Sequence, residues 1–255
     1  MSPALKEQVA IITGAGRGIG RELAFRFAEE GARLLLPDIS LERAENTARQ
    51  IKSQGWEALA IETDISDENA TRTMAEKAMQ IYGKVDILLN NAATYYGVNH
   101  KSWDAWTVEE WDKMFEVNVK GTWLCCKAIA PLMINQSHGK IINIASNIAR
   151  VQGAYGLLPY ACSKGAIYTL THALARALGK SGINVNAIAP GYTATEASLS
   201  QFDTDKTSKS SISMQSLPRR EEPTDLVGTA VFLASADSDF ITGQVIYVDG
   251  GLVML

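Results

Sequence analysis

The sequence predicts an α/β protein with one doubly wound parallel sheet of seven strands, flanked by helices. Short continuous apolar segments recur along the chain, which is typical of strands buried on both faces. Segments with helical periodicity alternate with them. Glycine-rich or polar turns follow several apolar segments, at the strand ends where such sheets bind ligands. No repeat or linker divides the chain, so we expect residues 1–255 to form a single domain.

Composition limits the classes of partner. The 255 residues are 46% hydrophobic and carry a formal net charge of −4, so nothing indicates a basic surface for nucleic acid. No apolar segment approaches the roughly 20 residues of a membrane span, and Met1 to Gln8 lacks the pattern of a signal peptide. The three cysteines show no spacing typical of a metal site. We therefore expect a cytoplasmic protein with a small-molecule partner and no metal.

The first predicted unit contains a candidate phosphate site. The strand Val9-Ala10-Ile11-Ile12 leads into Thr13-Gly14-Ala15-Gly16-Arg17-Gly18-Ile19-Gly20, which opens an amphipathic helix ending near Glu30. Glycines allow a tight turn, and free N–H groups at a helix N-terminus favour a pyrophosphate. A turn that binds no ligand is the alternative. We take as candidate cofactor contacts Gly14, Arg17, Gly18, Ile19 and Gly20.

An acidic residue follows the second predicted strand. This strand, Arg33 to Leu36, ends at Pro37-Asp38, about twenty residues after the glycines, where a carboxylate would accept hydrogen bonds from an adenosine ribose. A carboxylate there repels a 2′-phosphate, so Asp38 favours NAD over NADP. Arg17 argues weakly for the opposite preference. Asp38 could instead cap the helix of residues 41–53, although Ser40 is also suited to that role.

Two further units complete the first half of the sheet. A strand near residues 57–61 precedes Thr63-Asp64-Ile65 and a helix over 68–82. Asp64 and Ile65 are candidate adenine contacts, and a turn-stabilising role for Asp64 is equally consistent with the sequence. The fourth strand, residues 85–89, ends in Asn90-Asn91-Ala92-Ala93.

Tyr160 and Lys164 form a candidate acid/base pair. They are four residues apart on a predicted helix of residues 159–180, so both side chains lie on one helix face. An ammonium beside a phenol favours the phenolate, so we expect a lowered pKa for Tyr160. The same spacing is also common on solvated helices. Tyr155 is a weaker candidate because Pro159 takes the position of the lysine.

Together these motifs resemble the short-chain dehydrogenase/reductase family, from about Leu5 to Gly251. The matching segments are Thr13-Gly-x-x-x-Gly-x-Gly20, Asn90-Asn91-Ala92-Ala93 and Tyr160-x-x-x-Lys164. Ala93 replaces the glycine usual in the second motif. The resemblance implies a Rossmann-like dinucleotide fold and places Asn91 and Ala92 near the adenosine ribose.

The resemblance also implies two more catalytic residues. Asn118, within a predicted long helix of residues 108–133, matches the family asparagine that binds a water in a proton relay. A buried amide there would distort the helix locally, and a satisfied core amide is the alternative role. Ser146, after a strand of residues 140–145, matches the serine that hydrogen-bonds the substrate oxygen and is preferred to Ser137.

The last third of the chain resembles the segment that holds the nicotinamide end of the cofactor. A strand of residues 185–189 ends in Pro190-Gly191-Tyr192-Thr193-Ala194-Thr195, in which we take as candidate contacts Pro190, Gly191, Thr193 and Thr195. Turn chemistry is the alternative for both threonines. Residues 196–216 are polar and serine-rich, which predicts a mobile substrate lid over about 192–216. A helix over 224–233 and a strand over 243–248 follow.

The resemblance implies an NAD-dependent dehydrogenase of secondary alcohols, or a carbonyl reductase. Tyr160 would be the acid/base, and Lys164 would lower its pKa. Ser146 would orient the substrate oxygen, and Asn118 would support the proton relay. An acyl-chain ketoreductase and a dinucleotide-sensing protein without turnover are the alternatives. The family also implies a homotetramer. An apolar or cyclic substrate body is predicted by apolar residues in loops expected near the reacting carbon: Tyr95, Tyr96, Tyr155, Leu157, Leu158 and Tyr192.

Overall fold

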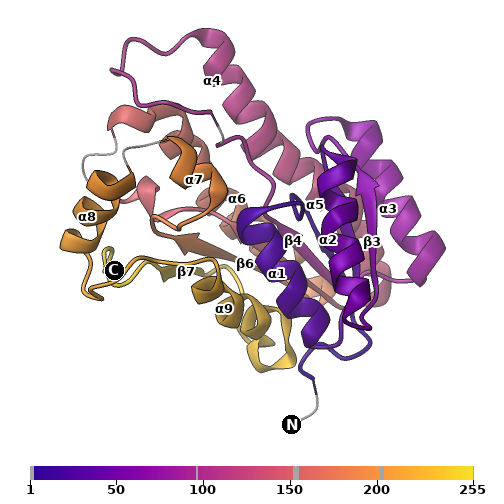
Figure 1. Ribbon diagram of the computed structural model, residues 1–255. Coiled ribbons are helices and arrows are strands. Elements are labelled where there is room, and N and C mark those ends of the chain that lie inside the picture. Colours follow the sequence, from indigo (N-terminus) through magenta and orange to yellow (C-terminus); the bar gives the residue numbers. More distant parts are fainter. Residues whose placement is uncertain (1–2, 96, 152–154, 202–203, 255) are drawn as a thin grey trace.

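Seven parallel strands form one sheet in the order β3-β2-β1-β4-β5-β6-β7. The computed structural model describes residues 3–95, 97–151, 155–201 and 204–254 (Figure 1). The strand order reverses between β1 and β4, because the chain passes from β3 back to the far side of β1. This confirms the predicted doubly wound class and its seven strands.

The strands lie within a few residues of their predicted positions. Their bounds are β1 Val9–Ile12, β2 Arg33–Asp38, β3 Ala58–Glu62, β4 Ile87–Asn90, β5 Gly139–Ile144, β6 Ile183–Pro190 and β7 Val245–Val248. In β1, Ala10 and Ile12 pack into the core on one face of the sheet, whereas Val9 and Ile11 pack into the core on the other. Burial on both faces explains why the strand is a continuous apolar segment without alternation.

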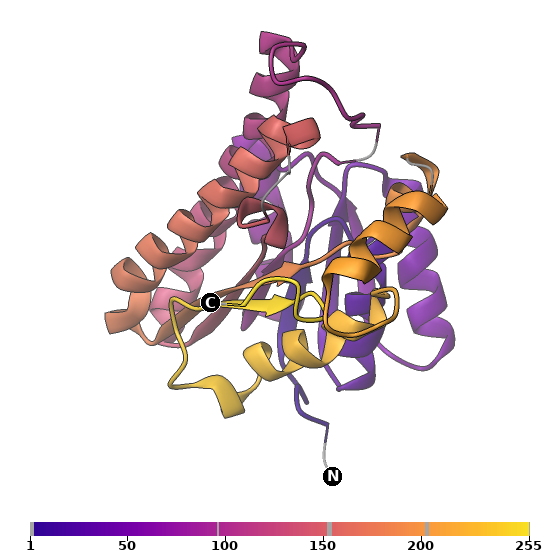
Figure 2. The same ribbon diagram turned by 90° about the vertical axis from the view of Figure 1, so that its left-hand side faces the viewer.

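Helices cover both faces of the sheet (Figures 1 and 2). One face carries α1 Gly18–Glu29, α2 Leu41–Ser53 and α9 Thr224–Ala234. The other carries α3 Glu68–Tyr82, α5 Thr122–Gln136 and α6 Leu158–Leu178. Among the described residues, no helix combines the length and the apolar character needed to cross a bilayer.

The helix predicted over residues 108–133 is interrupted. The structure has α4 Val108–Phe115, then a π-helical segment Glu116–Gly121, then α5. The α4 helix starts at a capping box, in which Thr107 and Glu110 each accept a hydrogen bond from the other's backbone. Asn118 lies within the π-helical segment, so the predicted local distortion is confirmed at this asparagine.

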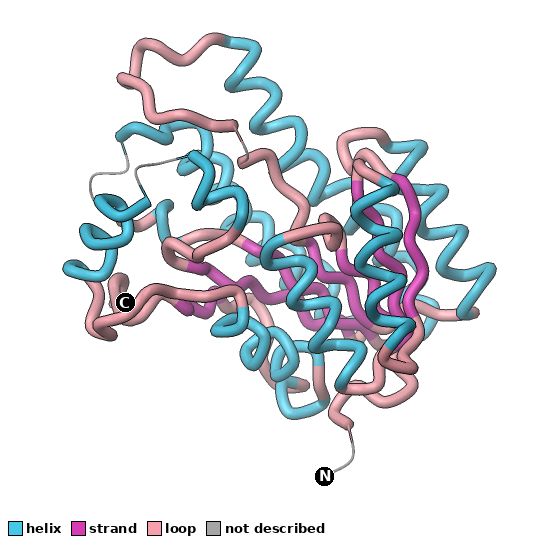
Figure 3. The backbone as a smooth tube through the Cα atoms, viewed as in Figure 1, coloured by secondary structure: helices cyan, strands magenta, loops and turns pink. Residues whose placement is uncertain are grey.

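The segment predicted to lack ordered structure forms helices. Its described residues include α7 Glu196–Gln201 and α8 Thr204–Met214, which lie beyond the end of β6 (Figure 3). The prediction from polarity was therefore wrong here. Local hydrogen bonds supply order that apolar burial does not: the buried Ser198 hydroxyl donates to the Thr193 carbonyl at 2.6 Å.

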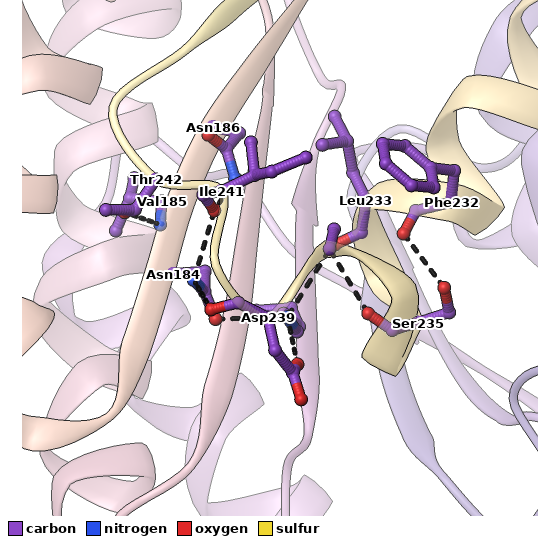
Figure 4. A network of polar contacts seen from close by, with 11 residues as sticks. Asn184, Val185, Asn186, Phe232, Leu233, Ser235, Asp239, Ile241 and Thr242 are labelled. Carbon is purple, nitrogen blue, oxygen red and sulfur yellow. Dashed lines mark hydrogen bonds and ion pairs between the residues drawn. The ribbon is translucent and has the colours of Figure 1, made fainter.

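A polar cluster closes the edge of the sheet at the amino ends of the strands. Figure 4 shows Asn184 and Asn186 of β6 turned toward the loop that leads into β7, where both side-chain amides donate to the Ile241 carbonyl. The buried Lys140 ammonium also binds this loop, with Asp239 Oδ1 at 2.7 Å and Asn184 Oδ1 at 3.0 Å. The loop is thus held by a buried charge whose partner carboxylate is 63% exposed.

We expect Asp239→Ala to lower the free energy of unfolding by about 1–3 kcal/mol, because it leaves the buried Lys140 ammonium without its counterion. Adding Lys140→Met should restore most of this loss, since the uncompensated charge is then removed. Urea unfolding at neutral pH measures both effects. Asp237→Ala, at an exposed neighbouring carboxylate, is the control. A double variant no more stable than Asp239→Ala would contradict the role given to Lys140.

Candidate active site

Two cavities meet at the carboxyl ends of the strands. The first has a volume of about 290 Å³ and lies over the turns that follow β1, β2, β3 and β4. The second has a volume of about 470 Å³ and lies between the turns after β5 and β6 and helix α8. The residues that line both cavities are Ile19, Tyr95, Ile144, Tyr160 and Thr195. Tyr160 therefore stands where contents of the two cavities would touch.

The glycine turn forms the floor of the first cavity. Gly14 and Gly18 have φ values of +66° and +54°, which side chains other than hydrogen disfavour. A Cβ on Gly14 would come within 2.8 Å of the Ala92 Cα, and one on Gly20 would collide with the Gly14 carbonyl. Arg17, Gly18 and Ile19 line the cavity, whereas Gly20 only allows the helix to approach the turn.

Asn91 and Thr13 join the turns after β1 and β4. The Asn91 amide donates to the carbonyls of Thr13 and Gly14 at 3.0 and 3.1 Å. The Thr13 hydroxyl accepts from the backbone N–H groups of Asn91 and Ala92, both at 3.0 Å. Thr13 was not predicted as a site residue, although it stands at the head of the glycine motif. The two turns thus form one wall that includes Asn91 and Ala92.

Asp38 lies at the end of β2, inside the first cavity. Its carboxylate accepts from the Gly16 N–H at 3.0 Å and from the Ser40 N–H at 2.9 Å, and it pairs with the Arg43 guanidinium at 3.2 Å. Ser40, not Asp38, is the cap of α2, since its hydroxyl accepts from the Arg43 N–H. Arg43 was not predicted; it lines the cavity together with Arg17 and Asp38.

Asp64 and Ile65 also line the first cavity. The Asp64 carboxylate accepts from the backbone and hydroxyl of Ser66 at 2.9 and 2.6 Å, so the predicted turn role is present at a residue that faces the cavity. Burial by itself would raise the pKa of Asp64. Hydrogen bonds from Ser66 and the charges of Lys113 and Lys120 outweigh burial and hold this pKa below its usual value. Asp64 therefore adds negative charge here.

Lys164 is buried beneath Tyr160, one helical turn along α6. Its ammonium donates to the Ile144 carbonyl at 2.7 Å and lies 5.7 Å from the centre of the Tyr160 ring. Tyr95 packs on the other side of the phenol, with ring centres 4.8 Å apart. Lys164 lines only the first cavity, whereas Tyr160 lines both, so the two groups share the first cavity and only Tyr160 reaches the second.

The predicted lowering of the Tyr160 pKa is wrong for this structure. Burial raises the pKa of the phenol, the nearby Tyr95 adds to the rise, and a hydrogen bond with Ser146 only partly opposes it. Burial also lowers the pKa of the Lys164 ammonium to about 8. Loss of contact with water is the largest cause of both changes, and it favours the neutral form of each group.

Ser146 lies at the end of β5, in the second cavity. Its hydroxyl accepts from the Ile148 N–H at 3.3 Å, and its carbonyl accepts from the Tyr168 hydroxyl at 2.7 Å. These contacts place the Ser146 hydroxyl beside Tyr160. The family resemblance gives this serine the role of hydrogen-bonding the substrate oxygen. Ser137 instead lies at the end of α5, in the left-handed conformation that stops the helix.

Asn118 lines neither cavity and is only 1% exposed. Its side-chain carbonyl accepts from the Thr94 N–H at 2.7 Å, and its amide donates to the Ser163 hydroxyl at 3.1 Å. Thr122 donates to its backbone carbonyl at 2.8 Å. These contacts match the alternative of a satisfied core amide, which ties the loop after β4 to helix α6.

The segment after β6 forms a wall of the second cavity, lined by Pro190, Gly191, Thr193 and Thr195. This segment is held in place by residues that were not predicted as site residues. The Glu221 carboxylate, which precedes α9, accepts from the Gly191 N–H and the Thr193 hydroxyl at 2.9 and 2.8 Å. The Thr195 N–H donates to the Ser198 hydroxyl at 2.9 Å. No local pattern links Glu221 to this segment, because thirty residues separate it from Gly191.

The second cavity has apolar walls formed by Ile148, Val151, Leu157, Met214 and Leu252, with hydroxyl groups of Ser198, Ser210 and Ser211 between them. Of the residues predicted to contact an apolar substrate, Tyr95, Leu157 and Tyr192 line it, whereas Leu158 does not. Tyr96 and the side chain of Tyr155 lie outside the described residues.

The first cavity fits a nicotinamide dinucleotide. Gly14 and Gly18 put no side chain of their own into the floor, and Arg17 supplies no side-chain cap to the first turn of α1. Free N–H groups at such a terminus favour a phosphate. Asp38 and Lys164 both line this cavity, where a carboxylate and an ammonium would offer partners to the ribose hydroxyls of a dinucleotide.

Known proteins are similar to this chain in sequence. A family model described as enoyl-(acyl carrier protein) reductase matches residues 14–253. The (2S)-[(R)-hydroxy(phenyl)methyl]succinyl-CoA dehydrogenase subunit BbsD of Thauera aromatica is 38% identical over 250 residues, which cover 97% of each chain.

Solved structures agree with the sequence matches. A gluconate 5-dehydrogenase of Burkholderia cenocepacia, solved with NADP and tartrate, has a TM-score of 0.92 at 35% identity and covers 98% of this chain and 97% of its own. A short-chain type dehydrogenase/reductase of Mycobacterium marinum has a TM-score of 0.92 at 30% identity and covers 100% of this chain and 98% of its own. With the glycine turn and the Tyr160/Lys164 pair, these matches show that the chain belongs to the short-chain dehydrogenase/reductase family of nicotinamide-dependent oxidoreductases.

Proposed function

We propose that the protein is an NAD-dependent dehydrogenase of secondary alcohols, acting in reverse as a ketone reductase, on a substrate with an apolar or cyclic body. The observation that carries this proposal is the position of Tyr160 on the wall shared by the two cavities. Lys164 lies on the side of the first cavity, and Ser146 lies on the side of the second. The bound dinucleotide supplies the hydride acceptor or donor.

The chain's own residues move the proton and orient the oxygen. Because burial raises the pKa of Tyr160, the phenol carries its proton at neutral pH and can donate it to a ketone oxygen held by Ser146. Alcohol oxidation needs the phenolate, so its rate should rise with pH, whereas ketone reduction needs the phenol and should fall only as the pH approaches the raised pKa of Tyr160. Below its pKa of about 8, the charged Lys164 assists oxidation by favouring the phenolate. Asn118 assists by fixing helix α6, since its amide donates to the Ser163 hydroxyl of that helix.

The walls of the second cavity support the proposed substrate. Tyr95, Leu157 and Leu252 offer an apolar surface on the side where Ser146 meets the substrate oxygen. The Thauera relative is named for a substrate with a phenyl group on the carbinol carbon, which agrees with such a surface. That substrate is also a coenzyme A thioester, so an acyl-chain ketoreductase is the second candidate.

A panel of alcohols tests the function. Initial rates of NADH formation should be highest with cyclic or aryl secondary alcohols and low with short charged hydroxy acids. A clear preference for the reduction of acyl thioesters would favour the second candidate. Absence of turnover together with tight dinucleotide binding would indicate a sensing protein instead.

We expect NAD to be preferred over NADP, because Asp38 presents a carboxylate where a 2′-phosphate would lie. Arg17 and Arg43 beside it reduce the preference without removing the negative charge. Asp38→Asn should shift the kcat/KM ratio toward NADP by about tenfold. The exposed neighbour Glu42, changed to Gln, is the matched control for charge. A higher kcat/KM for NADP in the unmodified enzyme would contradict the role given to Asp38.

We further propose that residues 1–255 act as one dinucleotide-binding and catalytic unit in the cytoplasm, with about 192–216 as a substrate lid, and that four copies associate. Two apolar side chains of α5 support association, since Trp123 and Ile134 are 43% and 42% exposed. Light scattering at micromolar concentration should give the mass of a tetramer. The mass of a monomer would contradict this assembly.

Tyr160→Phe should lower the rate by about 10²- to 10⁴-fold, because the ring still packs but carries no exchangeable proton. Its dissociation constant for NAD, measured by titration, should stay close to that of the unmodified enzyme. Lys164→Ala should weaken NAD binding as well as turnover, since the ammonium faces the first cavity. Tyr82→Phe, which removes a phenol far from both cavities, controls for the loss of a buried hydroxyl.

Rates measured across pH distinguish the possible outcomes for Tyr160. An unmodified rate in Tyr160→Phe would remove this residue from the mechanism. Loss of NAD binding in the same variant would instead show that the substitution had altered the cofactor site. Oxidation and reduction rates that change in the same direction with pH would contradict a shared acid/base group.

A further inference from the structure

Glu221 is a buried carboxylate behind the wall of the second cavity. It lies three residues before α9 and beneath the segment that leaves β6, and it is 7% exposed. Its backbone carbonyl accepts from the Ala194 N–H at 2.9 Å, and the backbones of Thr193 and Glu221 pair as a short parallel bridge. The position of Glu221 is therefore fixed by the backbone, independently of its side chain.

The side chain uses its two oxygens separately. One oxygen, Oε2, accepts from the Gly191 N–H at 2.9 Å, and the other, Oε1, accepts from the Thr193 hydroxyl at 2.8 Å. The fit is close, because a Cβ on Gly191 would lie 2.6 Å from Oε2 and 3.1 Å from the Asp249 Cβ. The carboxylate thus holds both ends of a three-residue turn that lines the cavity.

The charges around Glu221 are mostly negative. Asp225 at the start of α9 and Asp249 at the end of β7 both disfavour ionisation of Glu221. The Arg219 guanidinium, which is attracted to Glu221, is paired with Asp225 at 2.6 Å. Burial raises the pKa of Glu221 most, these carboxylates add to the rise, and the bonds from Thr193 and Gly191 oppose it, which leaves a pKa of about 7.

Protonation changes what the side chain can do. The ionised carboxylate accepts both hydrogen bonds. In the neutral acid, one oxygen still accepts from the Gly191 N–H. The other oxygen carries the proton and donates it toward Thr193, so the Thr193 hydroxyl has to turn and accept. The backbone bond to Ala194 is unaffected. Only the side-chain half of the contact therefore depends on the proton.

We propose that Glu221 is a positioning residue, whose ionised carboxylate holds Gly191 to Thr195 in the conformation that binds the nicotinamide end of the dinucleotide, and whose protonation weakens that binding. This inference rests on the proposed dinucleotide-dependent function. The residue acts through Gly191 and Thr193, which line the second cavity, whereas Glu221 does not.

Glu221→Gln tests the proposal, because a glutamine accepts from Gly191 and donates to Thr193 as the neutral acid does. Dissociation constants for NADH are measured by fluorescence titration near pH 6 and near pH 8. At the higher pH the variant should bind roughly three- to tenfold more weakly than the unmodified protein, the effect of one hydrogen bond. At the lower pH the two should agree. Comparing them at each pH removes the titration of other groups, including Lys164.

Matched variants separate positioning from general damage. Glu222→Gln makes the same change of charge at an exposed neighbour and should bind NADH as the unmodified protein does at both pH values. Thr193→Val removes the hydroxyl that contacts Oε1, so adding Glu221→Gln to it should have a much smaller effect than Glu221→Gln alone.

Thermal unfolding gives a readout with the opposite sign. A glutamate whose pKa is raised on folding contributes stability that is present in acid and is lost as the pH rises through about 7. Glu221→Gln should therefore raise the melting temperature near pH 8 more than near pH 6. A residue with only a structural role would not combine higher stability with weaker NADH binding.

The outcomes are distinguishable. Equal NADH affinity of Glu221→Gln and the unmodified protein near pH 8 would overturn the inference and leave the proposed function standing. A loss of affinity that is the same at both pH values would also overturn it, since the proton then plays no part. No NADH binding by the unmodified protein would overturn the proposed function and the inference with it.

Discussion

The site depends on the point where the sheet reverses its strand order. β1 and β4 are neighbours, but the chain leaves them toward opposite faces, so a cavity opens between their turns. Thr13 and Asn91 close the floor of that cavity with hydrogen bonds between the two turns. The glycine turn has no side chains of its own to hold it in place. The Asn91 amide and the Thr13 hydroxyl supply the rigidity that it would otherwise lack.

Burial, more than pairwise attraction, decides the electrostatics of the second half of the site. Loss of contact with water shifts three pKa values so that the neutral form of the group is favoured. These are the pKa values of Tyr160, Lys164 and Glu221. Each group then retains hydrogen bonds that fix its position. Burial therefore sets the protonation of the Tyr160/Lys164 pair and of the carboxylate that holds the segment after β6.

Helices α4 to α8 show where sequence patterns lose their predictive value. The apolar pattern over residues 108–133 is helical throughout, yet the backbone changes to a π-helical turn where the Asn118 amide must reach Thr94 and Ser163. The polarity of residues 196–216 predicted a mobile segment. In the structure, hydrogen bonds of Ser198 hold the start of α7 against the preceding turn. In both places a contact with a distant or following segment overrides the average character of the local sequence.

The sequence by itself predicted the strands, most of the helices, the glycine turn, Asp38 and the Tyr160/Lys164 pair, because these follow from local periodicity and from motifs of fixed spacing. Ser146 was predicted only through the family resemblance. Only the tertiary structure placed Glu221 beneath Gly191, thirty residues away along the chain. It also decided the direction of the Tyr160 pKa. The physical reason is that burial and long-range hydrogen bonds depend on which distant segments pack together, and no spacing along the chain records that.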